Sequence, residues 1–111
     1  MILTPHPGEM RRLQSAFGLD GEKSRIDQAL EMADCTGCTV ILKGCRSVIA
    51  SPDGAYSLNL SGCPALATAG SGDTLTGICG SFLAQGFSAW DAARLGAYLH
   101  GLAGEILAPC G

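Results

Sequence analysis

Positive charge is scarce in this sequence: Lys and Arg number 7 against 10 Asp and Glu, which gives a formal net charge of −3. A protein that binds nucleic acid through its phosphates needs a basic face, so a nucleic-acid partner is not expected. Long apolar runs are also missing, because Arg94, His100 and Glu105 interrupt the most apolar late stretch. We therefore expect no membrane span. No basic segment with an apolar core follows Met1, so we expect a soluble, cytoplasmic protein without a secretion signal.

Two common phosphate-binding motifs are absent. A P-loop needs Gly-Lys-Ser/Thr after its spacer, and no Lys or Arg occurs between Arg46 and Arg94. A Rossmann fingerprint needs a glycine at position 75, where this chain has Leu75. Any nucleotide site must therefore be built from a different glycine-rich turn.

The 6 cysteines contain a single pair at metal-binding or redox spacing, Cys35 and Cys38. The other four show no second pair at that spacing: Cys45, Cys63, Cys79 and Cys110. A lone pair is weak support for zinc or redox chemistry, which stays the less favoured alternative. We expect free structural thiols and no metal site, with Cys79 in the core.

The most informative stretch is residues 67–77, Ala-Thr-Ala-Gly-Ser-Gly-Asp-Thr-Leu-Thr-Gly, which places an acid on a glycine-rich turn. Downstream apolar residues follow the spacing of a helix buried on one face: Leu75, Ile78, Cys79, Phe82 and Leu83. This spacing predicts a helix that begins near Gly72. The first N–H groups of a helix lack internal partners and lie at its positive end, so they can bind an anion.

Gly70, Ser71 and Gly72 are therefore the candidate anion hole, and Asp73 is the candidate base beside it. The helix field favours the ionised form of an exposed Asp73 by roughly 0.3–1 kcal/mol. A carboxylate next to an anion hole suits deprotonation of a hydroxyl that attacks a phosphate. The structural alternative is that Asp73 only caps the helix and the glycines only turn the chain.

The front of the chain predicts alternating helices and strands. Residues 1–3 read as the end of a buried strand, and the prolines at 5 and 7 predict an irregular, stiff loop over residues 4–9 that presents His6. Helices are expected over residues 9–17 and 22–34, with a break at residues 18–21 between them and Gly37 as the stop of the second helix. A doubly covered strand is expected over residues 40–42. Such an order indicates α/β layering with parallel pairing.

The strand at residues 40–42 ends in Lys43-Gly44-Cys45-Arg46-Ser47, and ligands of open α/β sheets bind beyond the carboxyl ends of strands. Lys43 there is a candidate phosphate ligand, Gly44 leaves room for a ligand to approach the backbone, and the Ser47 hydroxyl is a candidate donor to a ligand oxygen. A solvated basic loop explains the segment equally well. The turn at residues 51–54 predicts a β-hairpin of residues 47–50 and 55–60. A last helix, over residues 88–107, is rich in Ala and Gly and is expected to be buried between layers.

Taken together, four segments resemble the nucleotide-dependent NAD(P)H-hydrate dehydratases, a branch of the ribokinase-like superfamily. They are Leu-Thr-Pro-His-Pro-Gly-Glu at 3–9, Leu-Lys-Gly at 42–44, Asp-Gly at 53–54, and Leu-Ala-Thr-Ala-Gly-Ser-Gly-Asp at 66–73 with Leu-Thr-Gly at 75–77. The resemblance extends over residues 1–111 and implies the C-terminal part of a three-layer α/β/α sandwich.

The resemblance implies a dehydration that restores hydrated NADH or NADPH at the expense of ADP or ATP, with Mg²⁺ on the phosphates. It makes Asp73 the base that takes the proton from the ring hydroxyl, and His6 a residue that contacts the hydrated cofactor. The segments that hold the nucleotide match these positions: Lys43, Gly44, Cys45, Arg46, Ser47 and Gly72.

The family domain is far longer than this chain, so we expect the isolated chain to have little or no activity. An exposed sheet edge is also expected, which favours a homo-oligomer. Two other functions remain open at the level of sequence. One is a small-molecule kinase for sugars or vitamin alcohols, because Gly-x-Gly-Asp serves hydroxyl phosphorylation generally. The other is a non-catalytic nucleotide-binding module.

Overall fold

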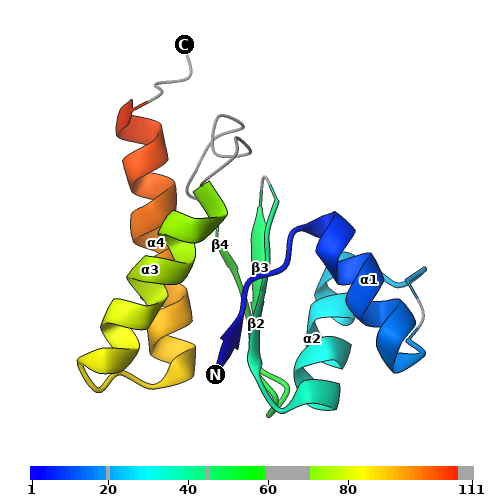
Figure 1. The fold of residues 1–111 in the computed structure, drawn as a ribbon. Coiled ribbons are helices and arrows are strands. Elements are labelled where there is room, and N and C mark those ends of the chain that lie inside the picture. Colours follow the sequence, from blue (N-terminus) through cyan, green and yellow to red (C-terminus); the bar gives the residue numbers. More distant parts are fainter. Residues whose placement is uncertain (20, 45, 60–70, 108–111) are drawn as a thin grey trace.

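The computed structural model describes residues 1–19, 21–44, 46–59 and 71–107, without the side chains of 71–73 and 103–107. Along the chain, a short strand is followed by two helices, three strands and two further helices (Figure 1). In order they are β1 (Ile2–Leu3), α1 (Pro7–Phe17), α2 (Arg25–Thr36), β2 (Thr39–Leu42), β3 (Ser47–Ala50), β4 (Tyr56–Asn59), α3 (Ser71–Ala84) and α4 (Ala89–Leu107).

The strands form one sheet in the order β1-β2-β3-β4. β1 and β2 are parallel, with Ile2 opposite Thr39, whereas β2, β3 and β4 are joined as antiparallel neighbours. The expected hairpin between β3 and β4 is confirmed: Gly54 adopts a φ of 97°, and the N–H of Ala55 donates to Asp53 Oδ1 at 3.1 Å. The parallel β1–β2 pair confirms the expected α/β layering.

Helices cover both faces of the sheet, which makes three layers (Figure 1). Alternate residues of β2 and β3 point to opposite faces, so each face has its own core. α1 and α2 pack with Val40, Leu42, Val48 and Ala50, while α3 and α4 pack with Ile41 and Ile49. All four residues of β2 are buried, as the uninterrupted apolar run predicts.

α1 corrects the expectation of an irregular loop up to Glu9, because Pro7 and Gly8 are its first two residues. Proline is tolerated at the start of a helix, where the missing N–H would have no partner inside the helix and the fixed φ already suits the helical backbone. The helix ends at Gly18, whose φ of 69° is the left-handed conformation that glycine adopts at little cost.

α2 begins three residues later than expected, at Arg25, because Ser24 caps it: the Ser24 hydroxyl accepts from the N–H of Asp27 at 3.2 Å. Gly37 ends it with a φ of 69°, as predicted.

α3 begins at Ser71, one residue before the position that the spacing predicts. Leu75 and Cys79 are buried as expected, but Leu83 is exposed. The Ser88 hydroxyl caps α4 by accepting from the N–H of Asp91 at 3.1 Å.

The expectation that α4 is buried between layers is only half right. Ala92, Ala93 and Ala97 are buried, whereas Leu95, Tyr98 and Leu99 are 39%, 52% and 41% exposed. Small residues let one side of α4 approach its neighbours closely, but they do not require a second layer on the other side.

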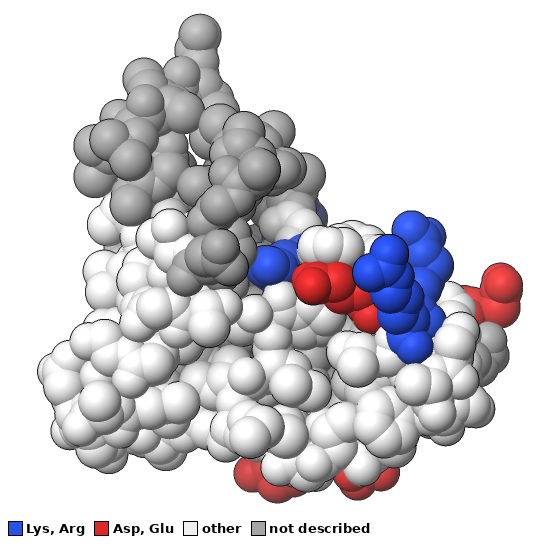
Figure 2. All heavy atoms as spheres, in the orientation of Figure 1, with Lys and Arg blue, Asp and Glu red and all other residues white. Residues whose placement is uncertain are grey.

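Charged side chains gather over α1 in Figure 2, and the described part of the surface formed by α3 and α4 shows no charged side chain in that view. Within the described ranges, no helix has the length and apolar character needed to cross a membrane.

Candidate active site

Three functional segments start or turn at the same end of the sheet, the end at which β1 and β2 finish, which we call the carboxyl end. In Figure 1 the start of α1, the β2–β3 turn and the start of α3 all lie there, opposite the β3–β4 hairpin. This arrangement follows from the order of the elements, because a helix that follows a strand begins where the strand ends.

Two hydrogen bonds tie these segments together. The Oγ1 atoms of Thr4 and Thr76 lie 3.2 Å apart, which joins the loop after β1 to α3 across 72 positions of sequence. The N–H of Lys43 donates to the carbonyl oxygen of Pro5 at 3.0 Å, which joins the same loop to the β2–β3 turn. Thr76 follows Asp73 by three positions, so the two residues share one side of α3.

His6 is held by a capping box at the start of α1. Its Nδ1 accepts from the N–H of Glu9 at 3.0 Å, and its own N–H donates to Glu9 Oε1 at 3.1 Å. Because Nδ1 is an acceptor, the proton of a neutral ring lies on Nε2. The side chain is 56% exposed. The sequence prediction that His6 is presented in a fixed position therefore has a structural basis, although the cap and not the prolines provides it.

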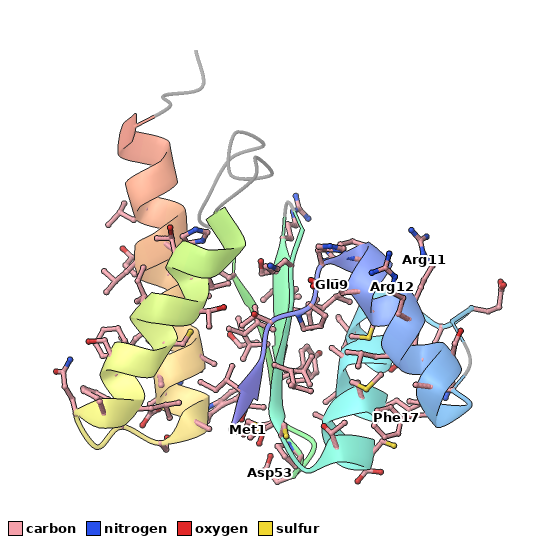
Figure 3. The ribbon with its side chains drawn as sticks, in the orientation of Figure 1. Met1, Glu9, Arg11, Arg12, Phe17 and Asp53 are labelled. Atoms are coloured by element: carbon pink, nitrogen blue, oxygen red, sulfur yellow. The ribbon has the colours of Figure 1, made fainter. Side chains whose placement is uncertain are left out.

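Glu9 is the partner that orients His6, and the sequence did not single it out. The N–H of His6 bonded to its carboxylate holds the pKa of Glu9 below the ordinary 4.5. Figure 3 shows Glu9 at the start of α1, with Phe17 at the far end of the helix. Gly8 keeps the imidazole close, since a Cβ there would lie 3.1 Å from His6 Cε1.

The predicted nucleotide segment forms the turn between β2 and β3. Lys43 is half-buried and Arg46 is exposed, while Ser47 is the first residue of β3 and pairs with Asn59. Cys45 lies outside the described residues. The geometry thus puts Lys43, Gly44 and Arg46 at the carboxyl end of the sheet, but their contact with a nucleotide stays a prediction.

Arg25 holds this turn and was missed by the sequence analysis. Its Nη1 donates to the carbonyl oxygen of Arg46 at 2.8 Å, and its Nη2 donates to those of Leu42 and Lys43 at 3.1 and 3.2 Å. The sequence did contain a general indication that Arg25 lies near this turn, because the helix that precedes a strand runs antiparallel to it and begins near the strand's carboxyl end. A cation in the first turn also opposes the helix dipole, which points to a partner elsewhere.

The predicted base and anion hole lie at the start of α3. Ser71, Gly72 and Asp73 are the first three residues of that helix, where N–H groups have no partner inside the helix. Gly70 and the Asp73 side chain lie outside the described part of the structure. Asp73 as base and the 70–72 anion hole therefore stay predictions, with the backbone position of Asp73 known.

A family model described as NAD(P)H-hydrate dehydratase matches residues 1–109. The chain belongs to the NAD(P)H-hydrate dehydratase family. The resemblance inferred from the motifs is thereby confirmed.

Curated relatives and solved structures agree. The bifunctional NAD(P)H-hydrate repair enzyme Nnr of Thermofilum pendens is 48% identical over 96% of this chain and 20% of its own length. The ADP-dependent (S)-NAD(P)H-hydrate dehydratase of Neisseria meningitidis is 45% identical over 96% of this chain and 36% of its own. The chain thus spans between a fifth and just over a third of the length of these two relatives.

A crystal structure of the ADP/ATP-dependent NAD(P)H-hydrate dehydratase of Bacillus subtilis, co-crystallized with ATP/Mg²⁺, superposes with a TM-score of 0.84 at 41% identity, covering 95% of this chain and 38% of that chain. A ribokinase-like superfamily protein of Enterococcus faecalis superposes with a TM-score of 0.77 at 38% identity, over 96% of this chain and 36% of that chain. The expected ribokinase-like α/β/α fold is confirmed.

For this member of the NAD(P)H-hydrate dehydratase family, the described residues contain no group of three His, Cys, Asp or Glu that could hold a metal ion. Mg²⁺ usually keeps several waters and binds through one or two carboxylates plus substrate phosphates, so its binding with a nucleotide does not need such a group.

The three described cysteines are free. Cys79 is buried as predicted, and burial raises the pKa of its thiol. Cys35 is exposed and Cys38 half-buried. Cys45, Cys63 and Cys110 lie outside the described ranges.

Proposed function

We propose that this chain carries the base and part of the nucleotide site for dehydration of hydrated NADH or NADPH, driven by ADP or ATP. One observation carries the proposal: the bonds from Thr4 to Thr76 and from Lys43 to Pro5 bring the substrate segment, the base-bearing helix and the nucleotide segment together. The relatives' names support the reaction, because one is called an ADP-dependent (S)-NAD(P)H-hydrate dehydratase.

In the proposed reaction Asp73 accepts the proton of the ring hydroxyl, whose oxygen attacks the terminal phosphoryl group of the nucleotide. The nucleotide leaves shortened by one phosphate, and the hydroxyl becomes a phosphate ester. Inorganic phosphate then departs with the C–O bonding electrons, and loss of a ring proton restores the double bond. Phosphoryl transfer of this kind depends mainly on positioning and charge stabilisation, to which Mg²⁺ bound on the phosphates would contribute.

The backbone position of Asp73 supports this role. As the third residue of α3, it lies where the helix field favours a carboxylate and where the N–H groups of Ser71 and Gly72, which have no partner inside the helix, favour phosphate oxygens. Lys43 and Arg46 add positive charge at the same end of the sheet. His6 would contact the substrate through Nε2, which lies 3.5 Å from Glu9 Oε1, since its Nδ1 is occupied by the cap.

A small-molecule kinase is the less favoured function, because the family match and the named relatives are dehydratases. Location in the cytoplasm and assembly into a homo-oligomer stay predictions.

The deciding experiment uses a chimera in which this chain replaces the matching segment of the Neisseria meningitidis relative. We expect nucleotide-dependent conversion of hydrated NADH, reduced at least 100-fold by Asp73→Asn. Asp53→Asn, at the hairpin on the opposite end of the sheet (Figure 3), is the matched control and should retain activity. The isolated chain should show little or no turnover.

A folded chimera that does not convert hydrated NADH, or that works equally well with Asp73→Asn, would refute the proposal. Sugars and vitamin alcohols are assayed in parallel. Their phosphorylation without dehydration would favour the kinase.

A further inference from the structure

Arg25 and Gly44 fit together in a way that the proposed function does not explain. A Cβ on Gly44 would lie 2.5 Å from Arg25 Nη2 and 3.1 Å from Cζ, which is too close for any other residue to leave the guanidinium in place. The space that a side chain would fill at position 44 is occupied by the arginine. Glycine at position 44 is therefore needed for a contact inside the protein, whether or not a ligand also approaches it.

The same contact sets the direction of the backbone. The carbonyl of Lys43 points to Arg25 Nη2, and no described peptide bond is cis. In a trans peptide the N–H points opposite to the carbonyl, so the N–H of Gly44 is directed away from Arg25 and α2. α2 covers one face of the sheet and α3 the other, so this N–H is directed away from the α2 layer (Figure 1).

The neighbouring peptide is held at both ends. The carbonyl of Leu42 accepts from Arg25, and the N–H of Lys43 donates to Pro5, so the bond between residues 42 and 43 cannot rotate without losing a partner. Arg25 also bonds the carbonyl of Arg46 across the turn. One guanidinium therefore fixes the entry and the exit of the turn, and its planar fork of donors suits three carbonyls better than an ammonium would.

We propose that Arg25 is a positioning residue for the nucleotide: it holds the 43–46 turn so that the Gly44 N–H and the Lys43 side chain are set to meet a phosphate. This inference rests on the proposed function, because it takes the turn to be the nucleotide segment. Arg25 acts through the backbone, because its Nη1 and Nη2 donate to the carbonyl oxygens that begin and end the turn.

The test is titration of the same chimera with Mg²⁺·ADP and Mg²⁺·ATP by calorimetry, combined with amide hydrogen exchange at residues 43–47. Arg25→Ala should weaken nucleotide binding at least 10-fold and speed exchange in the turn, and Arg25→Lys should recover little. Gly44→Ala keeps the charge but displaces the guanidinium, so it should weaken binding to a similar extent. Arg11→Ala, on the exposed side of α1 (Figure 3), is the matched control and should bind as the wild type does.

The double variant separates positioning from charge. If Arg25 and Gly44 act through one contact, Arg25→Ala with Gly44→Ala should lose no more affinity than the worse single variant. Wild-type affinity in Arg25→Ala or Gly44→Ala overturns the inference and leaves the proposed function standing. A chimera with the unmutated segment that binds neither nucleotide overturns both.

Discussion

Gly96→Ala tests how closely α4 packs against α3, the helix that carries Asp73. A Cβ on Gly96 would lie 2.7 Å from Cys79 Sγ, while the nearest backbone atoms of Cys79 are 3.6 Å away, an ordinary contact. Both positions are buried, so the sulfur is the single atom that an alanine at 96 would displace.

The magnitude follows from two opposed effects. Overpacking a core costs about 1–3 kcal/mol. Replacing glycine by alanine inside a helix contributes about 0.8–1.0 kcal/mol in the other direction. Gly96→Ala should therefore destabilise by roughly 0–2 kcal/mol. Cys79→Ala alone should lose about 1 kcal/mol through the methyl-sized cavity that it leaves.

The double variant should be close to wild type, because the new methyl fills the space that the sulfur vacates. The coupling between the two changes is then about 1–3 kcal/mol in favour of the double variant. Urea unfolding followed by the fluorescence of Trp90, the only tryptophan, measures it, since that ring packs against the α3–α4 core. Gly80→Ala, with open space around its Cβ, is the control and should stabilise by about 0.5–1 kcal/mol.

Gly96→Ala as stabilising as Gly80→Ala would refute the close packing. So would single effects that add within about 0.5 kcal/mol, because residues in contact should not behave independently.

Three further outcomes follow from the structure. His6→Ala should lower the free energy of unfolding by about 0.5–2 kcal/mol through loss of the cap, whereas His6→Asn should keep a cap and stability but weaken substrate binding in the chimera. Because the pKa of Glu9 is lowered in the folded state, its ionised carboxylate stabilises the fold fully above about pH 4.5, and this stabilisation is lost as pH falls through the folded-state pKa. Glu9→Gln should flatten this part of a profile of urea midpoint against pH, and an unchanged slope would count against the explanation. Tyr56 and Leu58 are 52% and 45% exposed on the outer strand β4, so we expect the wild type to self-associate and Leu58→Lys to reduce this self-association in sedimentation velocity. A wild type that sediments as a monomer would contradict the prediction.

The sequence predicted helix ends and turns well where they depend on the backbone preference of a single residue. Gly18, Gly37 and Gly54 all have positive φ at the ends and turns that the sequence indicated. Predictions failed where a side-chain cap decided instead. His6 takes the place of the usual Ser or Asp cap, so Pro7 and Gly8 became helical although proline and glycine usually break a helix.

Burial was predicted less well, because periodicity shows which side of a helix is apolar and not whether a neighbour covers it. Leu75 and Cys79 pack against the sheet, but Phe17 is 48% exposed although it shares the apolar spacing of Met10. On α4 the same reasoning overestimated the covered surface. Coverage depends on what lies beyond the helix, which the helix sequence does not contain.

In the candidate site too, the sequence indicated individual residues but not the contacts between distant segments. Candidate residues on the loops that follow strands were found from sequence, since the ends of parallel strands meet at one end of a sheet and Lys43 follows such a strand directly. Contacts between distant segments were not found, because neither Thr4 nor Thr76 carries a pattern that names the other.

Gly44 shows why this matters for interpreting glycine-rich ligand turns. A glycine at the end of a strand was taken as room for a ligand, but the structure fills that room with a guanidinium from a helix that begins 19 positions earlier. The two explanations make opposite predictions for a substitution. If the ligand needs the room, Gly44→Ala should act on its own, whereas if Arg25 needs it, removal of the arginine should abolish the effect of the alanine.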